Sequence, residues 1–209
     1  MQVIIIGDGG HSRVIQEMII SCGSSISAIL DDKYEHGIRR NGIIYAQISF
    51  LPKLLKKDTK IVIAIGSNAI RKRIVRRINI IPEMYATIIH PTAVISTSAQ
   101  IGYGTVVMPH VVINAQAAVG THCIINTASI IEHDNTIGDF SHISPNATLT
   151  GNVTTGEGVH VGASSTIIPG KHLGSWSIIG AGSTVIEHIP AYSKAVGCPT
   201  RIIERILIK

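Results

Sequence analysis

The feature that most limits how this chain can fold is an aliphatic residue that returns at every sixth position of its second half. From position 89 to position 185, 17 consecutive positions of this series hold 16 aliphatic residues and one threonine. The series runs Ile89, Ile95, Ile101, Val107, Ile113, Val119, Ile125, Ile131, Ile137, Ile143, Leu149, Thr155, Val161, Ile167, Leu173, Ile179, Val185. A period of six fits neither an α-helix nor a single strand, and it is typical of the hexapeptide repeat of a parallel β-helix.

The repeat has a direct physical reading. Each hexapeptide forms one flat side of a triangular coil, and three hexapeptides close a coil of 18 residues. The aliphatic side chain points toward the axis and stacks on its counterpart one coil away, at the ordinary strand spacing of about 4.8 Å. Small residues, such as the glycine after Ile101, Ile137 and Ile179, let the chain turn at the corners. Residues 89 to 190 therefore predict about five to six coils, because a β-sandwich of short strands would not hold one register for so long.

Residues 1–88 have a different rhythm. Apolar runs predict strands at residues 3–7, 26–32, 60–68 and 85–90, and helical spacing predicts helices at residues 11–22 and 69–80. This alternation favours a small, Rossmann-like parallel α/β sheet. We therefore predict two domains: an α/β domain over residues 1–88 and an all-β parallel β-helix, with a C-terminal tail, over residues 89–209.

Composition limits the partners of the chain. Aromatic residues are 4% and charged residues 15% of the sequence, so the core is aliphatic and the low charge favours self-association. The net charge of +5 comes partly from a basic segment, Arg71 to Arg77, which we expect to be the solvated face of one helix. It has no interleaved aromatic residues and no nucleic-acid motif, so we predict no nucleic-acid partner.

The cysteines and the N-terminal residues bear on the cellular compartment in which the protein is expected. Cys22, Cys123 and Cys198 are far apart and form no CxxC pair, which favours neither a zinc site nor a disulfide framework. We expect a reducing, cytoplasmic location. Met1 leads straight into "QVIIIG" without a signal-peptide pattern, and no apolar run reaches the roughly 18 residues of a membrane span.

The coil geometry gives meaning to the histidines. His142 and His160 are 18 positions apart, so they should stack on adjacent coils. His133 and His142 are nine positions apart and should face different sides of the prism, so a pocket that uses both requires a second subunit. His133 is flanked by Glu132 and Asp134, and a carboxylate on one ring nitrogen makes the other nitrogen a better general base. The alternative is an ordinary surface histidine.

The first glycine-rich turn is a weaker signal. "GDGGH" (residues 7–11) follows a predicted strand and opens a helix, where backbone N–H groups suit a phosphate. The dinucleotide fingerprint is incomplete, because position 12 is serine, and a purely structural turn is the alternative. Asp31 and Asp32 end the next strand, where a carboxylate can bind a ribose or a base.

Together, "IEHDNTIGDFSHISPNATLTGNV", "IGAGSTV" and "GDGGH" resemble the bacterial hexapeptide-repeat sugar acetyltransferases of the PglD and NeuD type. These include acetyl-CoA-dependent N-acetyltransferases of nucleotide-linked 4-amino sugars and sialic acid O-acetyltransferases. The resemblance covers nearly the whole chain. It implies a left-handed β-helix, a homotrimer, and acetyl-CoA in the cleft between neighbouring helices, with no metal.

The resemblance also implies roles for single residues. His133 matches the catalytic base, and Asp134 matches the acidic residue that strengthens it, although the best-known members have glutamate there. The implied acetyl-CoA contacts are His142, Gly151, Ala163 and Ala181. The implied sugar-nucleotide contacts are Gly9, Gly10, His11 and Gly66, to which the strand-end carboxylates Asp31 and Asp32 are added.

The expected reaction is acyl transfer to the amino group of a nucleotide-linked (UDP or dTDP) 4-amino-dideoxy sugar, for surface glycan or exopolysaccharide synthesis. Transfer to a hydroxyl group, as in sialic acid O-acetylation, is the nearest alternative, because both reactions need one base. A β-helical metalloprotein of the carbonic anhydrase type, with His133, His142 and His160 as ligands, and a non-catalytic scaffold are the alternatives from other classes.

Overall fold

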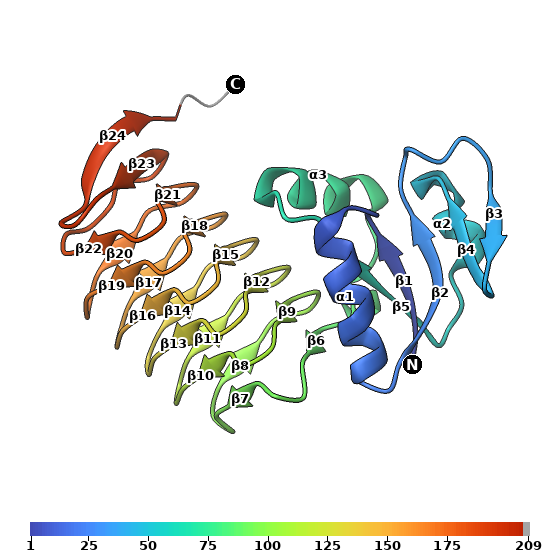
Figure 1. The fold of residues 1–209 in the computed structure, drawn as a ribbon, viewed down its shortest axis with the longest axis horizontal. Coiled ribbons are helices and arrows are strands. Elements are labelled where there is room, and N and C mark those ends of the chain that lie inside the picture. The colour runs from blue at the N-terminus through green and yellow to red at the C-terminus, as the bar shows by residue number, and fades with distance from the viewer. Residues whose placement is uncertain (207–209) are drawn as a thin grey trace.

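The computed structural model describes residues 1–206; the last three residues of the predicted second domain lie outside them. The chain begins with a five-stranded sheet, the N-terminal sheet, and continues into a solenoid of short parallel strands (Figure 1). These are the α/β sheet and the parallel β-helix that the two sequence rhythms predict.

The N-terminal sheet has the strand order β3-β4-β2-β1-β5. All of its pairings are parallel except the β3–β4 hairpin at one edge, which the sequence patterns did not predict. Its strands are β1 (Gln2–Ile6), β2 (Ser25–Leu30), β3 (Ile38–Arg40), β4 (Ile43–Ala46) and β5 (Thr59–Ile63). The helices are α1 (Gly10–Ser21), α2 (Leu51–Leu54) and α3 (Asn68–Ile78), with short 3-10 turns η1 (Ile48–Phe50) and η2 (Pro82–Met84).

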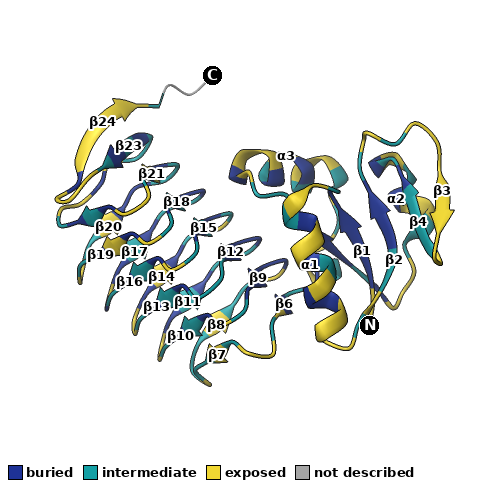
Figure 2. Ribbon diagram, viewed as in Figure 1, coloured by how far each residue is buried: buried dark blue, intermediate teal, exposed yellow. Residues whose placement is uncertain are grey.

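The predicted strand at residues 85–90 is divided between the two parts. Tyr85 makes an isolated parallel bridge to Ile61 of β5, whereas β6 (Ile88–Ile89) pairs with β9 and belongs to the solenoid. The central strands β1 and β2 are dark blue and the edge strand β3 is yellow in Figure 2, because helices cover the middle of the sheet and leave its edge in solvent.

The solenoid has three sides, each a stack of short strands. The eight-stranded sheet holds β6, β9 (Val106–Val107), β12 (Ile124–Ile125), β15 (His142–Ile143), β18 (His160–Val161), β21 (Ile178–Ile179), β23 (Ser193–Val196) and β24 (Arg201–Arg205). The six-stranded sheet holds β7 (Val94–Ile95), β10 (Val112–Ile113), β13 (Ile130–Ile131), β16 (Thr148–Leu149), β19 (Thr166–Ile167) and β22 (Thr184–Val185). The five-stranded coil sheet holds β8 (Gln100–Ile101), β11 (Ala118–Val119), β14 (Thr136–Ile137), β17 (Thr154–Thr155) and β20 (His172–Leu173).

The register is the 18-residue one that the sequence predicts. Ile113 pairs with Ile131, and Ile131 pairs with Leu149, in parallel strands. All three side chains are fully buried. Thr155, the single polar member of the series, satisfies its hydroxyl by accepting a hydrogen bond from the Gly138 N–H at 3.0 Å. From β9 to β22 the second residue of each strand therefore fills the axis, and the first faces outward.

Candidate active site

His133 and Asp134 lie at a corner of the solenoid, in the turn between β13 and β14. Asp134 has a φ of +60°, the left-handed region that aspartate and asparagine tolerate better than other side chains. The turn aims both side chains away from the axis, and 60% of the His133 side chain and 57% of the Asp134 side chain are exposed. Nδ1 of His133 lies 2.7 Å from Oδ2 of Asp134.

This contact fixes the tautomer of the neutral imidazole. A carboxylate only accepts hydrogen bonds, so Nδ1 of His133 carries the proton and Nε2 presents its lone pair to the outside. Glu132 does not compete for the ring, because its Oε2 accepts a hydrogen bond from Asn114 Nδ2 at 2.8 Å. Of the two flanking carboxylates, Asp134 is therefore the one that contacts the ring, and Nε2 makes no hydrogen bond to another group of residues 1–206.

Gly151 lies one coil away, directly beside the His133 ring. A Cβ atom at Gly151 would come within 2.6 Å of Cε1 and Nε2 of His133. The backbone of Gly151 has no positive φ, so the glycine is required by the imidazole and not by the turn. Among residues 1–206 the Gly151 N–H makes no hydrogen bond to another protein group.

Asn135 supports this corner from inside the solenoid. The sequence patterns did not identify it. Its side chain is fully buried, and its Nδ2 donates to the carbonyl oxygens of Glu132 at 2.6 Å and Thr150 at 3.0 Å. The amide therefore joins the turn that holds His133 to the chain just before Gly151. Many turns of the solenoid contain asparagine or threonine, so the sequence does not distinguish Asn135 from the others.

His142 and His160 occupy the eight-stranded sheet, a different side of the prism from His133. They pair across β15 and β18, with ring centroids 4.8 Å apart, which confirms the predicted stack. Asn126 Oδ1 accepts from the Thr127 N–H at 2.8 Å, so its Nδ2 is the atom that donates to His142 Nε2 at 3.0 Å. In the neutral ring the proton is then on Nδ1.

The surroundings of His142 keep it neutral. Burial, followed by the nearby His160, Arg71 and His11, lowers the pKa of His142 to about 3. Burial and then Arg71 also lower the pKa of His11, at the start of α1, to about 4. His11 of the glycine-rich turn thus contributes to the electrostatic surroundings of His142.

The other predicted coenzyme contacts lie at two different corners. Ala163 and Ala181 are in equivalent turns after β18 and β21, and the Gly182 N–H donates to the Ala163 carbonyl oxygen at 2.8 Å. They stack in one column, at the corner between the eight- and six-stranded sheets. Gly151 and His133 lie at the next corner, between the six-stranded sheet and the five-stranded coil sheet.

The predicted sugar-nucleotide contacts gather at the carboxyl edge of the N-terminal sheet. Gly9 is the N-cap residue of α1, and a side chain at Gly9, Gly10 or Gly66 would meet nothing within 4 Å. The two carboxylates already have partners within the chain. Asp31 accepts from the backbone N–H groups of Asp8 and Lys33. Asp32 forms an ion pair with Arg77 at 2.5 Å.

The prediction that the basic segment is a solvated helix face is wrong for Arg71. Its side chain is 1% exposed. It donates from Nε to the His122 carbonyl oxygen at 2.7 Å, from Nη1 to Ile65 at 2.9 Å, and from Nη2 to Phe140 at 2.8 Å. Burial lowers the pKa of Arg71 to about 10. This one guanidinium joins the loop before α3 to two turns of the solenoid.

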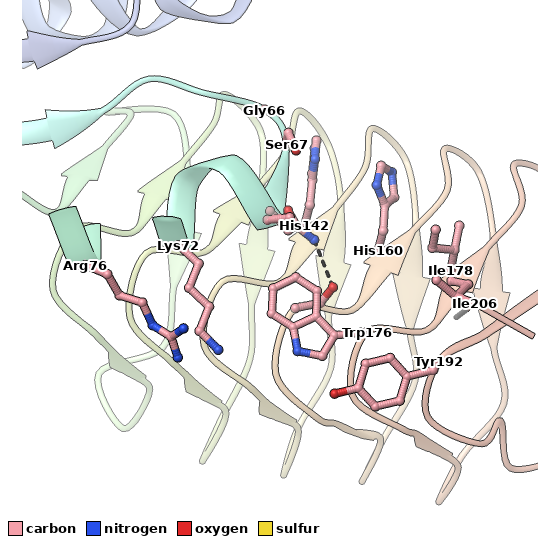
Figure 3. A pocket seen from close by; sticks show the side chains of 13 residues that line it. Gly66, Ser67, Lys72, Arg76, His142, His160, Trp176, Ile178, Tyr192 and Ile206 are labelled. Atoms are coloured by element: carbon pink, nitrogen blue, oxygen red, sulfur yellow. Dashed lines mark hydrogen bonds between the residues drawn. The ribbon is translucent and has the colours of Figure 1, made fainter. Parts of the chain in front are cut away.

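Two cavities flank α3. One, of about 800 Å³, lies between α3 and the outer face of the eight-stranded sheet (Figure 3). We call it the α3 cavity; its lining includes Gly66, Lys72, Arg76, His142, His160, Trp176, Ile178, Tyr192 and Ile206. The other, of about 400 Å³, lies toward the N-terminal sheet, and Asp31, Asp32, Arg73 and Arg77 are among its lining residues. We call it the sheet-edge cavity.

Residues 1–206 contain neither a metal-binding cluster nor a membrane-spanning helix. No group of three or more histidine, cysteine, aspartate or glutamate side chains in that range is placed to hold a metal ion. None of the helices in the same range is both long and apolar enough to cross a membrane.

Comparisons with known proteins agree with this geometry. The sequence model of the PglD N-terminal domain matches residues 2–78. UDP-N-acetylbacillosamine N-acetyltransferase of Bacillus subtilis (strain 168) is 44% identical over 104 residues. That match covers 48% of this chain, and the chain spans about half the length (48%) of that curated relative.

Solved structures match over nearly the full length. PerB from Caulobacter crescentus, in complex with CoA and GDP-perosamine, is 33% identical with a TM-score of 0.89, over 98% of both chains. The acetyltransferase domain of PglB from Neisseria gonorrhoeae FA1090, in complex with acetyl coenzyme A, is 32% identical with a TM-score of 0.86, over 97% of this chain and 98% of that one. The chain therefore belongs to the PglD-type family of left-handed β-helix sugar acetyltransferases.

Proposed function

We propose that this protein transfers the acetyl group of acetyl-CoA to the amino group of a nucleotide-linked 4-amino-dideoxy sugar. The observation that carries the proposal is the acid-oriented His133, whose free Nε2 lies beside the bare Gly151 backbone, on a chain of this family. The relatives support the choice of an amino acceptor, because those that resemble this chain over nearly its full length include an N-acetyltransferase with CoA and GDP-perosamine bound.

Each proposed group has one task. The sugar nitrogen attacks the thioester carbon, the new C–N bond forms, and the C–S bond to coenzyme A breaks. His133 Nε2 takes the proton from nitrogen and can pass it to the departing thiolate, while Asp134 stabilises the imidazolium. The free N–H of Gly151 is our candidate donor to the oxyanion of the tetrahedral intermediate. None of the three cysteines is needed for a covalent intermediate.

The division of labour follows the two parts of the chain. Residues 1–88 hold the nucleotide sugar through Gly9, Gly10, His11 and Gly66, with Asp31 and Asp32 at the nucleoside end. Residues 89–209 hold acetyl-CoA through His142, Gly151, Ala163 and Ala181. Asp32 is ion-paired with Arg77, so a ribose or base would bind this pair rather than a free carboxylate.

We further propose a threefold homotrimer. His133 and Ala163 lie at different corners of one chain, on either side of the six-stranded sheet, so a coenzyme that contacts both corners requires a second protomer. Threefold association would form three equivalent clefts. The three free cysteines suit a reducing compartment, and we place the reaction in the cytoplasm, in the synthesis of a surface glycan or exopolysaccharide.

A thiol-release assay tests the proposal. Acetyl-CoA is offered with a panel of UDP-, dTDP- and GDP-linked 4-amino-dideoxy sugars, with sialic acid and with 4-hydroxy sugar nucleotides as controls. We expect CoA release with at least one amino sugar and a product that has gained one acetyl group on nitrogen. Release only with the hydroxyl acceptors, or with none of the panel, would contradict the proposal.

A further inference from the structure

Asn135 is the one fully buried side-chain amide of the solenoid within residues 1–206. The equivalent positions one coil before and one coil after it hold Ala117 and Val153, both buried, since the strands β11, β14 and β17 that follow these three residues pair in register. The solenoid thus closes this corner with a small aliphatic side chain in the neighbouring coils. Closing the coil does not require an amide, so Asn135 needs another explanation.

The amide makes two hydrogen bonds that hydroxyl groups elsewhere in the solenoid make singly. Ser129 donates to the carbonyl oxygen three residues before it at 2.7 Å, and Ser165 donates to the carbonyl oxygen 15 residues after it at 2.8 Å. Nδ2 of Asn135 makes both bonds, at 2.6 Å to Glu132 and at 3.0 Å to Thr150. A hydroxyl group has one proton to donate and an amide nitrogen has two, so serine could not replace it fully.

Each of these carbonyl groups shares a peptide unit with a residue of the proposed machinery. The Glu132 carbonyl shares its peptide plane with the His133 N–H, and both peptide bonds in question are trans. The Thr150 carbonyl shares its plane with the Gly151 N–H. In a planar trans peptide the C=O and N–H point in opposite directions, so holding both oxygens toward the buried amide turns both N–H groups outward. Neither N–H bonds to another backbone group of residues 1–206.

The arrangement lowers stability at one atom. Oδ1 of Asn135 is buried and accepts no hydrogen bond from any of residues 1–206, and a buried acceptor without a donor is unfavourable. The remaining oxygen near Nδ2, the Leu149 carbonyl oxygen at 3.3 Å, already accepts from the Glu132 N–H at 2.9 Å. A buried polar group that is only partly satisfied calls for a reason beyond folding, and its two short bonds both lead to the corner of His133 and Gly151.

We propose that Asn135 is a positioning residue for acyl transfer. It fixes the peptide planes before His133 and Gly151 relative to each other, so that the base and the oxyanion donor face the same thioester. This inference rests on the proposed function. Asn135 is fully buried and touches neither ligand, so it acts through the backbone alone. A displacement of about 1 Å from the productive geometry can lower a rate by about 10²-fold.

Steady-state kinetics of two Asn135 variants provide the test. Asn135→Ser keeps one of the two short hydrogen bonds, and Asn135→Ala keeps neither. We expect kcat to fall by about threefold to tenfold in the first and by about 10–100-fold in the second, with the KM of each substrate within about twofold of wild type. A kcat of Asn135→Ala equal to that of wild type would overturn the assignment.

Thr105→Val is the matched control for the loss of one interior hydrogen bond. Thr105 is fully buried and donates at 2.8 Å to the carbonyl oxygen 15 residues ahead, and neither group belongs to a residue of the proposed site. Thr105→Val should keep the wild-type kcat, and Asn135→Ser should lower the unfolding temperature no more than this control does. An equal loss of kcat in Thr105→Val and Asn135→Ser would show that loosening of the solenoid, and not positioning, lowers the rate.

The pH dependence of kcat/KM separates positioning from a change in basicity. Asp134 still contacts the His133 ring when Asn135 is replaced, so the acidic limb of the profile should stay at the wild-type pH in Asn135→Ala while the plateau falls. A displaced limb with an unchanged plateau would mean that Asn135 tunes the protonation of the imidazole, and would overturn the positioning role.

The outcomes distinguish this inference from the proposed function. If wild type acetylates an amino sugar and Asn135→Ala does so equally fast, the proposed function stands and the role of Asn135 is wrong. If wild type acetylates only a hydroxyl acceptor, the proposed acceptor is wrong, and the same variants are compared on the acceptor that reacts. An enzyme that acetylates none of the panel overturns both.

Discussion

His133 and His142 are nine residues apart in one solenoid, yet their surroundings are opposite. His133 lies in an exposed turn, 2.7 Å from a carboxylate and beside a glycine that leaves its ring free. His142 lies under α3, stacked on His160 and close to the buried guanidinium of Arg71, which helps to lower its pKa to about 3. One imidazole is exposed and hydrogen-bonded to a carboxylate, and the other is buried and kept neutral.

The comparison teaches which parts of a site arise from local sequence. The His133 corner is made by a six-residue segment and its copy one coil away, so the repeat places every member. The His142 site is made by α3, the loop before it and several coils of the solenoid, which only tertiary packing brings together. The first is the base in our proposal, and the second is a neutral ring held by Asn126.

Removing the base should have the largest effect. His133→Ala should lower kcat by about 10²–10⁴-fold, the usual value of general-base help. The side chain is exposed, so the unfolding temperature and acetyl-CoA binding should be almost unchanged. A variant that keeps more than a few per cent of the wild-type kcat would show that His133 is not the base.

Removing the buried guanidinium of Arg71 should instead weaken the contact between the N-terminal domain and the solenoid. Arg71→Met leaves buried carbonyl oxygens without donors, at about 1–3 kcal/mol each, so we expect the free energy of unfolding to fall by about 3 kcal/mol or more. Arg73→Met, two residues along the same helix and exposed, is the matched control and should change it by less than about 0.5 kcal/mol. Equal effects in chemical denaturation would show that Arg71 is not a structural tie.

A methyl group added at Gly151 should test whether the His133 ring needs the space beside it. Gly151→Ala would place a Cβ within 2.6 Å of the His133 ring and push it out of position, so we expect kcat to fall by about 10–100-fold. The double variant with His133→Ala should lose nothing further, because the displaced group is already absent. Additive losses in the double variant would mean that Gly151 acts independently of the imidazole.

The buried histidines should make stability depend on pH. The pKa values of His11 and His122 are lowered to about 4, and that of His142 to about 3. In the unfolded chain these groups take up protons below about pH 6.5. Unfolding therefore binds protons between about pH 6.5 and pH 4, and stability falls as the pH drops through this window, by up to about 1.4 kcal/mol per pH unit for each group.

The variant His122→Phe tests the source of this slope. His122 stacks on Phe140 at 5.2 Å and meets Tyr85 edge-on, so phenylalanine keeps the packing and removes one titrating group. Urea unfolding between pH 4 and pH 7 should show a slope reduced by about one proton relative to wild type. An unchanged slope would mean that His122 does not contribute.

The sequence predicts the features that the six-residue repeat determines, and it does not predict those that depend on packing between the two domains. The six-residue period is enough by itself to place Ile113, Ile131 and Leu149 in the axis and His142 over His160. It does not place Arg71, which looks like any other member of a charged helical run and is buried only because α3 packs on the solenoid. Trp176 is likewise one turn residue among many, and its contacts with Gly158 and Lys72 follow only from the packing of coils and helix.

The central claim is that each active site combines His133 of one protomer with the ligand-binding groups of its neighbour, and subunit complementation tests it most directly. His133→Ala lacks the base, and Gly66→Trp fills the α3 cavity from a position with open space around it. Each variant alone should be inactive. Co-expressed with two different tags and purified through both as mixed trimers, they should recover activity toward about a third of wild type, because every trimer that contains both variants has one intact cleft among three equivalent ones. Mixed trimers that remain as inactive as the separate variants would show that one chain supplies both halves of the site.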